Sequence, residues 1–210
     1  MRKTQKKRQS LKLPLVSTVY AEKDYDSNNG FLTPVWGPSM WHVLHTISFN
    51  YPAKPTDCQK RKYREFIMNL KHVLPCGKCR KNLYKNMEKL PLTMKHMKSR
   101  STFSRYIYDL HEVVNTMLNK KSGLTYEDVK ERYEHFRARC AVSGGKTRKR
   151  LPKHKKEEGC VQPLVGEKAK CILKIVPQDT KCETFQVDER CVKRGEGKPT
   201  VSPSTPSLNK

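Results

Sequence analysis

The sequence STFSRYIYDLHEVVNTMLNKK, residues 101–121, carries the clearest structural signal in the chain. Its apolar residues recur every three or four positions, which is the spacing of one face of an α-helix. That face comprises Phe103, Tyr106, Ile107, Leu110, Val114, Met117 and Leu118. Gly123 follows and is a typical helix stop. A helix with so broad an apolar face must bury it against other elements, so this stretch predicts a helical core.

Two helices are predicted before this one. The segment 33–52 has Pro38 at a position that suits the first turn of a helix, where no backbone donor is needed. The residues expected on its repeating face are Trp41, Leu44, His45 and Ser48. The segment 55–75 has a capping residue at Thr56 or Asp57. Its expected buried face is Tyr63, Phe66, Ile67 and Leu70.

Two more helices complete the pattern. One is predicted to begin at Cys76 and to end near Met87, and a shorter one lies within residues 125–140, where the first residues form a capping-box pattern. Four helices and a short fifth with short connections, all between residues 31 and 140, predict an all-α bundle.

Composition divides the remaining chain into segments. We expect a basic flexible arm over 1–30, a basic linker over 141–158, a Cys-containing extension over 159–195 and a disordered tail over 196–210. Residues 170–177, KCILKIVP, are compatible with a short strand. Two roles for the extension remain open: it relays electrons through its cysteines, or it packs on the bundle or mediates assembly.

Charge and hydropathy limit the class of protein. The formal net charge is +24, and only 35% of residues are hydrophobic. No run approaches the roughly 18 apolar residues of a transmembrane helix, and the basic start lacks the apolar core of a secretory signal, so neither is predicted. The positive charge would attract nucleic acid, acidic proteins or a phosphorylated cofactor, although a solvated Lys-rich surface explains it equally well.

Eight cysteines lie at positions 58, 76, 79, 140, 160, 171, 182 and 191. Cys76 and Cys79 form a C-x-x-C pair at the expected start of a helix, a position whose free N–H groups and partial positive charge stabilise a thiolate. The spacing of three residues puts both sulfurs on one face, close enough to form a disulfide.

The C-x-x-C pair is compatible with redox chemistry or with zinc. Zinc needs two further ligands, usually a second C-x-x-C or paired histidines. The chain has no second C-x-x-C, and His72 has no evident partner. Redox chemistry is therefore the leading interpretation, and a dithiol of this kind needs an electron acceptor such as a redox cofactor.

Two further patches indicate a pocket for such a cofactor. Trp41 and His45 lie four residues apart on one predicted helix, and His111 and Asn115 lie four apart on another. An aromatic plate with His and Asn donors suits a flat heterocycle that carries phosphates. The alternative is that each histidine is a satisfied core residue and each tryptophan is packing.

Three motifs in order give the chain a family resemblance. They are Trp36-Gly37 with Trp41 and Leu44-His45, then Cys76 with Cys79, then His111 with Val114-Asn115. Over roughly residues 31–140 this order resembles the Erv/ALR sulfhydryl oxidases, and it is similar to the thiol oxidases of large DNA viruses. One departure is Glu112, where the family often has asparagine.

The resemblance implies a four-helix bundle around non-covalent FAD, with a short fifth helix and usually a homodimer. It implies oxidation of protein dithiols to disulfides, with molecular oxygen reduced to hydrogen peroxide. The implied flavin-site residues are Trp36, Trp41, His45 and Tyr51, and the implied adenine–phosphate contacts are His111, Asn115 and Lys120. Cys79 would lie nearest the flavin, and Cys76 would meet the incoming thiol.

The resemblance also suggests a location in the cytoplasm of an infected host cell or in the virion, away from any membrane. Two alternatives remain at this point. One is a basic module in which the C-x-x-C pair holds zinc and the positive charge holds nucleic acid. The other is a structural or packaging protein that is cross-linked through the cysteines of its tail.

Overall fold

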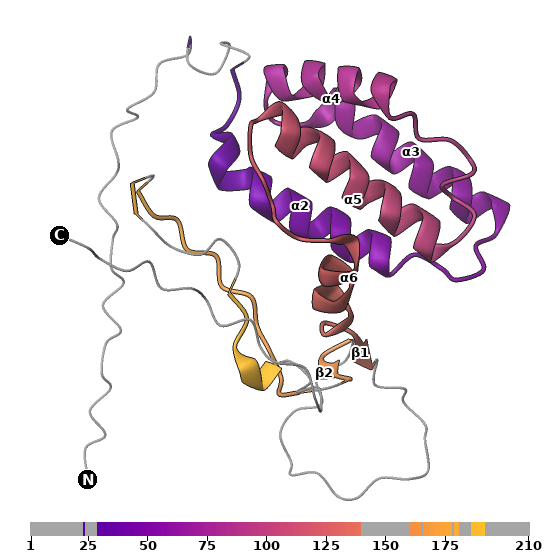
Figure 1. The fold of residues 1–210 in the computed structure, drawn as a ribbon, viewed down its shortest axis with the longest axis vertical. Coiled ribbons are helices and arrows are strands. Elements are labelled where there is room, and N and C mark those ends of the chain that lie inside the picture. The colour runs from indigo at the N-terminus through magenta and orange to yellow at the C-terminus, as the bar shows by residue number, and fades with distance from the viewer. Residues whose placement is uncertain are drawn as a thin grey trace, which may run out of the picture.

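The computed structural model describes residues 23, 29–139, 160–164, 166–177, 179–180 and 186–191. Five α-helices lie within residues 29–139: α2 (Thr33–Phe49), α3 (Asp57–Val73), α4 (Gly77–Lys89), α5 (Arg100–Met117) and α6 (Tyr126–Glu134). The first four lie side by side as a bundle, and α6 extends from one end of it (Figure 1). The prediction of an all-α bundle with a short fifth helix is confirmed.

Local sequence sets the start of most of these helices. Capping boxes open α3 at Thr56, α5 at Ser99 and α6 at Thr125, where each hydroxyl accepts a hydrogen bond from a backbone N–H of the first turn. In α4 the N-cap is Cys76, whose sulfur accepts the equivalent hydrogen bond. Because these caps satisfy orphan backbone donors, the predicted helix starts at Thr56 and Thr125 are confirmed.

The beginning of the predicted helix at residue 33 is confirmed, but the expectation that Pro38 lies in its first turn is wrong. The helix begins at Thr33, with Pro34 in the first turn, and Pro38 lies inside the helix. Both prolines satisfy the rule that a first-turn residue needs no backbone donor, so the rule by itself could not choose between them. The additional turn carries Thr33 to the end of the bundle where α4 begins.

The core forms around α5. Its residues Phe103, Tyr106, Ile107 and Leu110 are buried against the other helices, which confirms the first three turns of the predicted apolar face. The last turn differs, because Met117 and Leu118 are 40% and 48% exposed. The face predicted for α3 is likewise correct at Ile67 and Leu70 and wrong at Phe66, which is 41% exposed.

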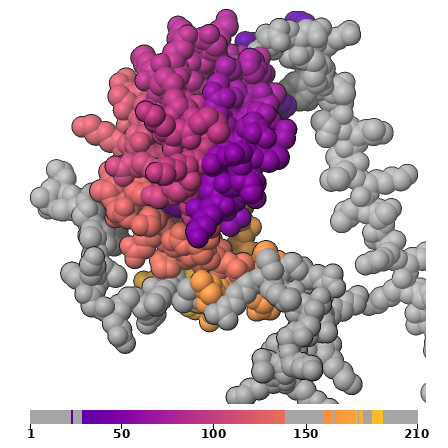
Figure 2. Space-filling model, turned by 90° about the vertical axis from the view of Figure 1, so that its right-hand side faces the viewer, coloured from indigo at the N-terminus to yellow at the C-terminus, as the bar shows by residue number. Residues whose placement is uncertain are grey.

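A two-stranded sheet attaches the described part of the extension to the helices. Strand β1 (Ala138–Arg139) pairs antiparallel with β2 (Gln162–Pro163), and the Leu164 N–H donates to the Arg137 carbonyl at 2.8 Å. Figure 2 shows the orange residues of the extension gathered at the end of the bundle near α6. A short 3-10 helix, Glu189–Cys191, is the last described element.

The strand predicted within residues 170–177 is wrong, since those residues have no regular secondary structure and Ile172, Leu173 and Ile175 are exposed. The expectations for the arm, linker and tail fall largely outside the described residues. Within the described residues, no helix is long and apolar enough to cross a membrane.

Candidate functional site

Cys76 and Cys79 form a disulfide at the beginning of α4, with their Cα atoms 5.1 Å apart. Cys76 is the N-cap of the helix, and Cys79 lies in its first turn. The prediction that this spacing places both sulfurs within bonding distance is confirmed.

The backbone stabilises one of the two sulfurs. The Cys79 N–H donates to the Cys76 Sγ at 3.2 Å, so Cys76 occupies the position at which a helix stabilises negative charge. The Arg80 guanidinium donates to the Leu74 carbonyl at 2.6 Å, which fixes a positive charge across the turn before the disulfide. A thiolate formed at this turn therefore meets a helix N-terminus and a cation.

A second cluster joins α2 and α5. The Trp41 and His111 rings are stacked with centroids 3.9 Å apart and an interplanar angle of 7°. The His45 Nε2 lies 3.0 Å from the His111 Nδ1, within hydrogen-bonding distance. The structure therefore brings together three residues that the sequence had placed in two separate patches.

Burial keeps both histidines neutral. His45 is only 3% exposed, and this burial, followed by the nearby His111 and His42, lowers its pKa from 6.5 to about 3. Burial also lowers the pKa of His111 to about 4, with Glu112 opposing the shift and Lys120 reinforcing it. At neutral pH one imidazole donates a proton to the hydrogen bond and the other accepts it.

We expect the stability of the protein to fall as the pH drops from 7 to 5. An unfolded histidine has a pKa near 6.5, so in this range the unfolded chain binds protons that the folded His45 and His111 do not. The stability that this difference in proton binding contributes is fully present above pH 6.5. It is lost as the pH falls toward the folded pKa values of about 3 for His45 and about 4 for His111. For His45 alone the loss by pH 5 is about 2 kcal/mol, with a nearly equal one from His111, because both folded pKa values lie below pH 5.

Urea unfolding at pH 7, 6 and 5 measures this effect. The groups that face His45 are His42 on its own helix, His111 on α5 and Tyr133 on α6. A His45→Leu variant fills the same space without titrating, so its unfolding free energy should change less over this range. An equal pH dependence in both proteins would contradict the assignment.

The other predicted site residues occupy different positions. The Asn115 Nδ2 donates to the Glu112 Oε1 at 2.9 Å. Glu112, where this chain departs from the family pattern, is therefore hydrogen-bonded to Asn115, a residue predicted to contact the cofactor. Lys120 is exposed just beyond the end of α5. The Trp36 indole donates to the Phe31 carbonyl at 3.1 Å and thereby ties α2 to the residues before it.

Tyr51 lies in the hydrophobic core, fully buried. Its hydroxyl donates to the Met97 carbonyl at 2.9 Å, and its ring packs against Tyr63 and Phe103. The described ring contacts of Tyr51 are therefore with the core and not with the Trp41 and histidine cluster.

Sequence reasoning missed two residues of this cluster, Tyr133 and His42. The Tyr133 ring lies 5.3 Å from the His45 ring, and its hydroxyl lies 3.2 Å from the His42 Nδ1. Burial raises the pKa of Tyr133 to about 12. An aromatic residue on the short fifth helix was visible in the sequence, but nothing local linked it to α2.

The site fits a flat cofactor on two observations. The His45 Nδ1 is buried with no hydrogen-bond partner in the described structure. It can therefore form a hydrogen bond with a ligand atom. Gly37 lies on α2 one turn before Trp41, and a Cβ placed there would have only the Thr33 Cγ2 within 4 Å, at 3.6 Å. The missing side chain leaves space beside the tryptophan, between it and the disulfide end of α2.

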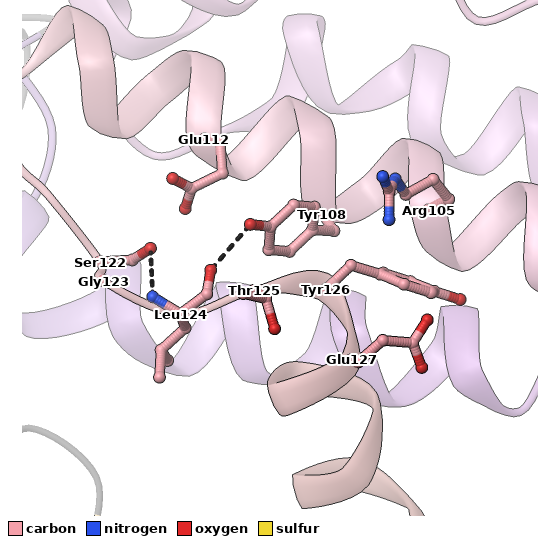
Figure 3. A pocket seen from close by; sticks show the side chains of 9 residues that line it. All are labelled: Arg105, Tyr108, Glu112, Ser122, Gly123, Leu124, Thr125, Tyr126 and Glu127. Carbon is pink, nitrogen blue, oxygen red and sulfur yellow. Dashed lines mark hydrogen bonds between the residues drawn. The ribbon is translucent and has the colours of Figure 1, made fainter.

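An open cavity of about 420 Å³ lies elsewhere, between α5 and the segment that leads into α6. It is lined by Arg105, Tyr108, Glu112, Ser122, Gly123, Leu124, Thr125, Tyr126 and Glu127 (Figure 3). Its wall is held by the Tyr108 hydroxyl, which donates to the Leu124 carbonyl at 2.7 Å. None of the predicted site residues lines this cavity.

The zinc interpretation finds no support in the part of the chain that the structure describes. No group of three or more His, Cys, Asp or Glu side chains there is arranged to hold a metal ion. The two cysteines that would supply half of a zinc site are bonded to each other.

Comparison with known proteins adds an independent finding. Residues 38–134 match the family model described as Erv1 / Alr family. A probable FAD-linked sulfhydryl oxidase of Acanthamoeba polyphaga mimivirus is 38% identical over 99 residues, which cover 47% of this chain and 68% of the relative. An FAD-linked sulfhydryl oxidase of African swine fever virus is 30% identical over 99 residues, covering 47% of this chain and 80% of the relative.

Among solved structures, the yeast Erv1 core matches with 27% identity and a TM-score of 0.45, covering 57% of this chain and 94% of that one. Residues 38–134, which match the family model, contain the disulfide, the histidine pair and Tyr133.

Proposed function

The chain belongs to the Erv1/Alr family, and we propose on this basis that it is an FAD-linked sulfhydryl oxidase that forms disulfides in protein substrates. The observation that carries the proposal is the Cys76–Cys79 disulfide at the N-terminus of α4 inside the family domain. This arrangement is a redox-active pair rather than a structural cross-link, because it closes a loop of only a few residues and adds little to stability.

The chemistry of the proposal begins at the sulfurs. A substrate thiolate attacks the Cys76 Sγ, the bond to Cys79 breaks, and the electron pair remains on the Cys79 Sγ. A second substrate thiolate then resolves the mixed disulfide, which leaves the substrate oxidised and the Cys76–Cys79 pair reduced. The free N–H groups at the start of α4 stabilise the thiolate form of Cys76. FAD, when bound, would accept the two electrons and transfer them to molecular oxygen, giving hydrogen peroxide.

We propose that α2 and α5 hold the FAD. Trp41 and the neutral pair of His45 and His111 supply an aromatic face and hydrogen-bonding nitrogens, while Asn115 and the positive charge of Lys120 suit the adenine–phosphate end. Trp36 holds the residues before α2 against that helix, and we assign it to the flavin end of the proposed site. Tyr51 supports the site from the core, because its hydroxyl is already engaged by the Met97 carbonyl.

The partners follow from the same proposal. We expect thiol-containing proteins as substrates, molecular oxygen as the acceptor and a homodimer as the assembly. The relatives in mimivirus and African swine fever virus support a location in the cytoplasm of an infected cell or in the virion. The positive charge permits nucleic acid as a further partner but the activity does not require it. We propose that residues 159–195 are an extension appended to the flavin domain, and the described part of it joins the helices at the β1–β2 pair.

The purified full chain tests the proposed function directly. It should be yellow, with flavin absorbance, and should consume oxygen and release hydrogen peroxide when supplied with dithiothreitol or a reduced protein. A colourless protein that contains zinc and consumes no oxygen would contradict the proposal and favour the metal-binding alternative.

A further inference from the structure

The residues just before α2 cross the turn that carries the disulfide. The Phe31 N–H donates to the Pro75 carbonyl at 2.8 Å. Gly30 has a positive φ of 78°, and a Cβ at that position would lie 2.1 Å from the Pro75 carbonyl oxygen. Only glycine permits so close an approach, so this crossing is a precise backbone contact that places Thr33 against the start of α4.

Thr33 is directed at the two sulfurs. Its Oγ1 lies 3.5 Å from the Cys79 Sγ and 4.0 Å from the Cys76 Sγ. Its Cγ2 lies on the other side, 3.6 Å from the position of a Cβ on Gly37. Threonine is stiff at χ1 because two heavy atoms branch from its Cβ, so few rotamers compete with the one that directs the hydroxyl at the sulfurs.

The hydroxyl is available for this contact. Within the described residues, the hydrogen-bond partners of the Thr33 hydroxyl are the two sulfurs of Cys76 and Cys79. The two sulfurs also differ in their donors. Cys76 receives the Cys79 N–H, whereas within the described residues no hydrogen bond other than that of Thr33 reaches the Cys79 sulfur.

We propose that Thr33 is the hydrogen-bond donor that stabilises Cys79 as a thiolate. This inference rests on the proposed thiol oxidase function. When a substrate thiolate bonds to the Cys76 Sγ, the disulfide breaks and its electron pair leaves on the Cys79 Sγ, with no proton or outside oxidant required. The Thr33 O–H then donates to that sulfur. A hydrogen bond to the charged form lowers the thiol pKa, and a leaving thiol of lower pKa departs faster.

Three variants of one helix separate this role from packing. Thr33→Val keeps the shape of the side chain and removes the donor, while Thr33→Ser keeps the donor and removes the methyl group. Thr46→Val is the matched control, because Thr46 lies on the same helix with its hydroxyl donating to the His42 carbonyl. Thermal melting of each full-length protein confirms that the fold is retained.

The first readout is the equilibrium of the Cys76–Cys79 pair in thiol–disulfide buffers, followed by alkylation and mass spectrometry. Thr33→Val should favour the oxidised pair about fivefold to tenfold, the latter being about 30 mV. The second readout is the pH dependence of Cys79 alkylation in a Cys76→Ser background, where Thr33→Val should raise the thiol pKa by about one unit. Thr33→Ser and Thr46→Val should stay within twofold of the parent in the first readout.

Turnover with dithiothreitol should follow the same order, falling severalfold in Thr33→Val and recovering in Thr33→Ser. Equal shifts in the valine and serine variants, or no shift in either sulfur readout, would overturn the proposal. Both sulfur readouts are independent of FAD. A protein without flavin or oxidase activity in which Thr33→Val still shifts them would contradict the proposed function and leave the role of Thr33 intact.

Discussion

A Cys79→Ala variant is expected to lose more than about a thousandfold of its turnover while it retains bound FAD, since removing a residue that takes part in the covalent step of an enzyme commonly costs this much. The reason is that Cys76 has lost the sulfur with which it forms the disulfide. The substitution leaves the proposed FAD residues on α2 and α5 in place. Oxygen consumption with dithiothreitol measures turnover, and the ratio of flavin to protein absorbance measures bound FAD.

A matched control is Cys58→Ala, because Cys58 is an exposed free cysteine in the first turn of α3. That variant should keep both its colour and its activity. Cys76→Ala should lose turnover in the same way as Cys79→Ala, since either cysteine alone is unable to form the pair. Oxygen consumption at the parent rate in Cys76→Ala or Cys79→Ala would show that the electrons do not pass through this disulfide.

A His45→Ala variant should lose roughly 2–5 kcal/mol of stability, the range for truncating a large buried side chain. His45 is 3% exposed between α2, α5 and α6, and its removal leaves a cavity and an unpaired nitrogen on His111. FAD binding should weaken as well, so the melting temperature of the purified protein should fall by at least about 10 °C. Thermal unfolding and flavin content measure the two effects.

Two further variants separate packing from cofactor binding. His45→Leu refills the space, so it should recover most of the stability lost in apoprotein while FAD remains weakly bound. His72→Ala removes an exposed histidine at the end of α3 and should change neither quantity. If His45→Ala melts and binds flavin like the parent protein, the proposed site on α2 and α5 is wrong.

Several elements of the fold could be predicted because their causes are local. The capping boxes at Thr56 and Thr125 act within a single turn, so the starts of α3 and α6 were readable from four consecutive residues. The apolar face of α5 was predictable from the spacing of its apolar residues. That spacing does not show at which turn the face ceases to be buried. Met117 and Leu118 keep the period yet are 40% and 48% exposed, although the Asn86 side chain of α4 reaches the Met117 sulfur.

The start of α2 shows the opposite case. Pro34 and Pro38 meet the same local requirement, and the residues just before the helix are held by a non-local contact between the Phe31 N–H and the Pro75 carbonyl, 44 residues away in sequence. The pairing of β1 with β2 is equally non-local, because it joins residues on either side of a segment with no periodic pattern. Period and propensity carry no information about such contacts.

The sequence by itself determined the helical class, the C-x-x-C pair and the residue types of the proposed cofactor site, because each depends on spacing within one helix. Cys76 and Cys79 are three residues apart, and Trp41 and His45 are four apart, so one helix suffices to align each pair. Only the tertiary structure decided that His45 bonds to His111, that Tyr133 joins them, and that the Thr33 hydroxyl reaches the Cys79 sulfur. Those contacts join different helices, and they exist only once burial of the apolar faces has brought the helices together.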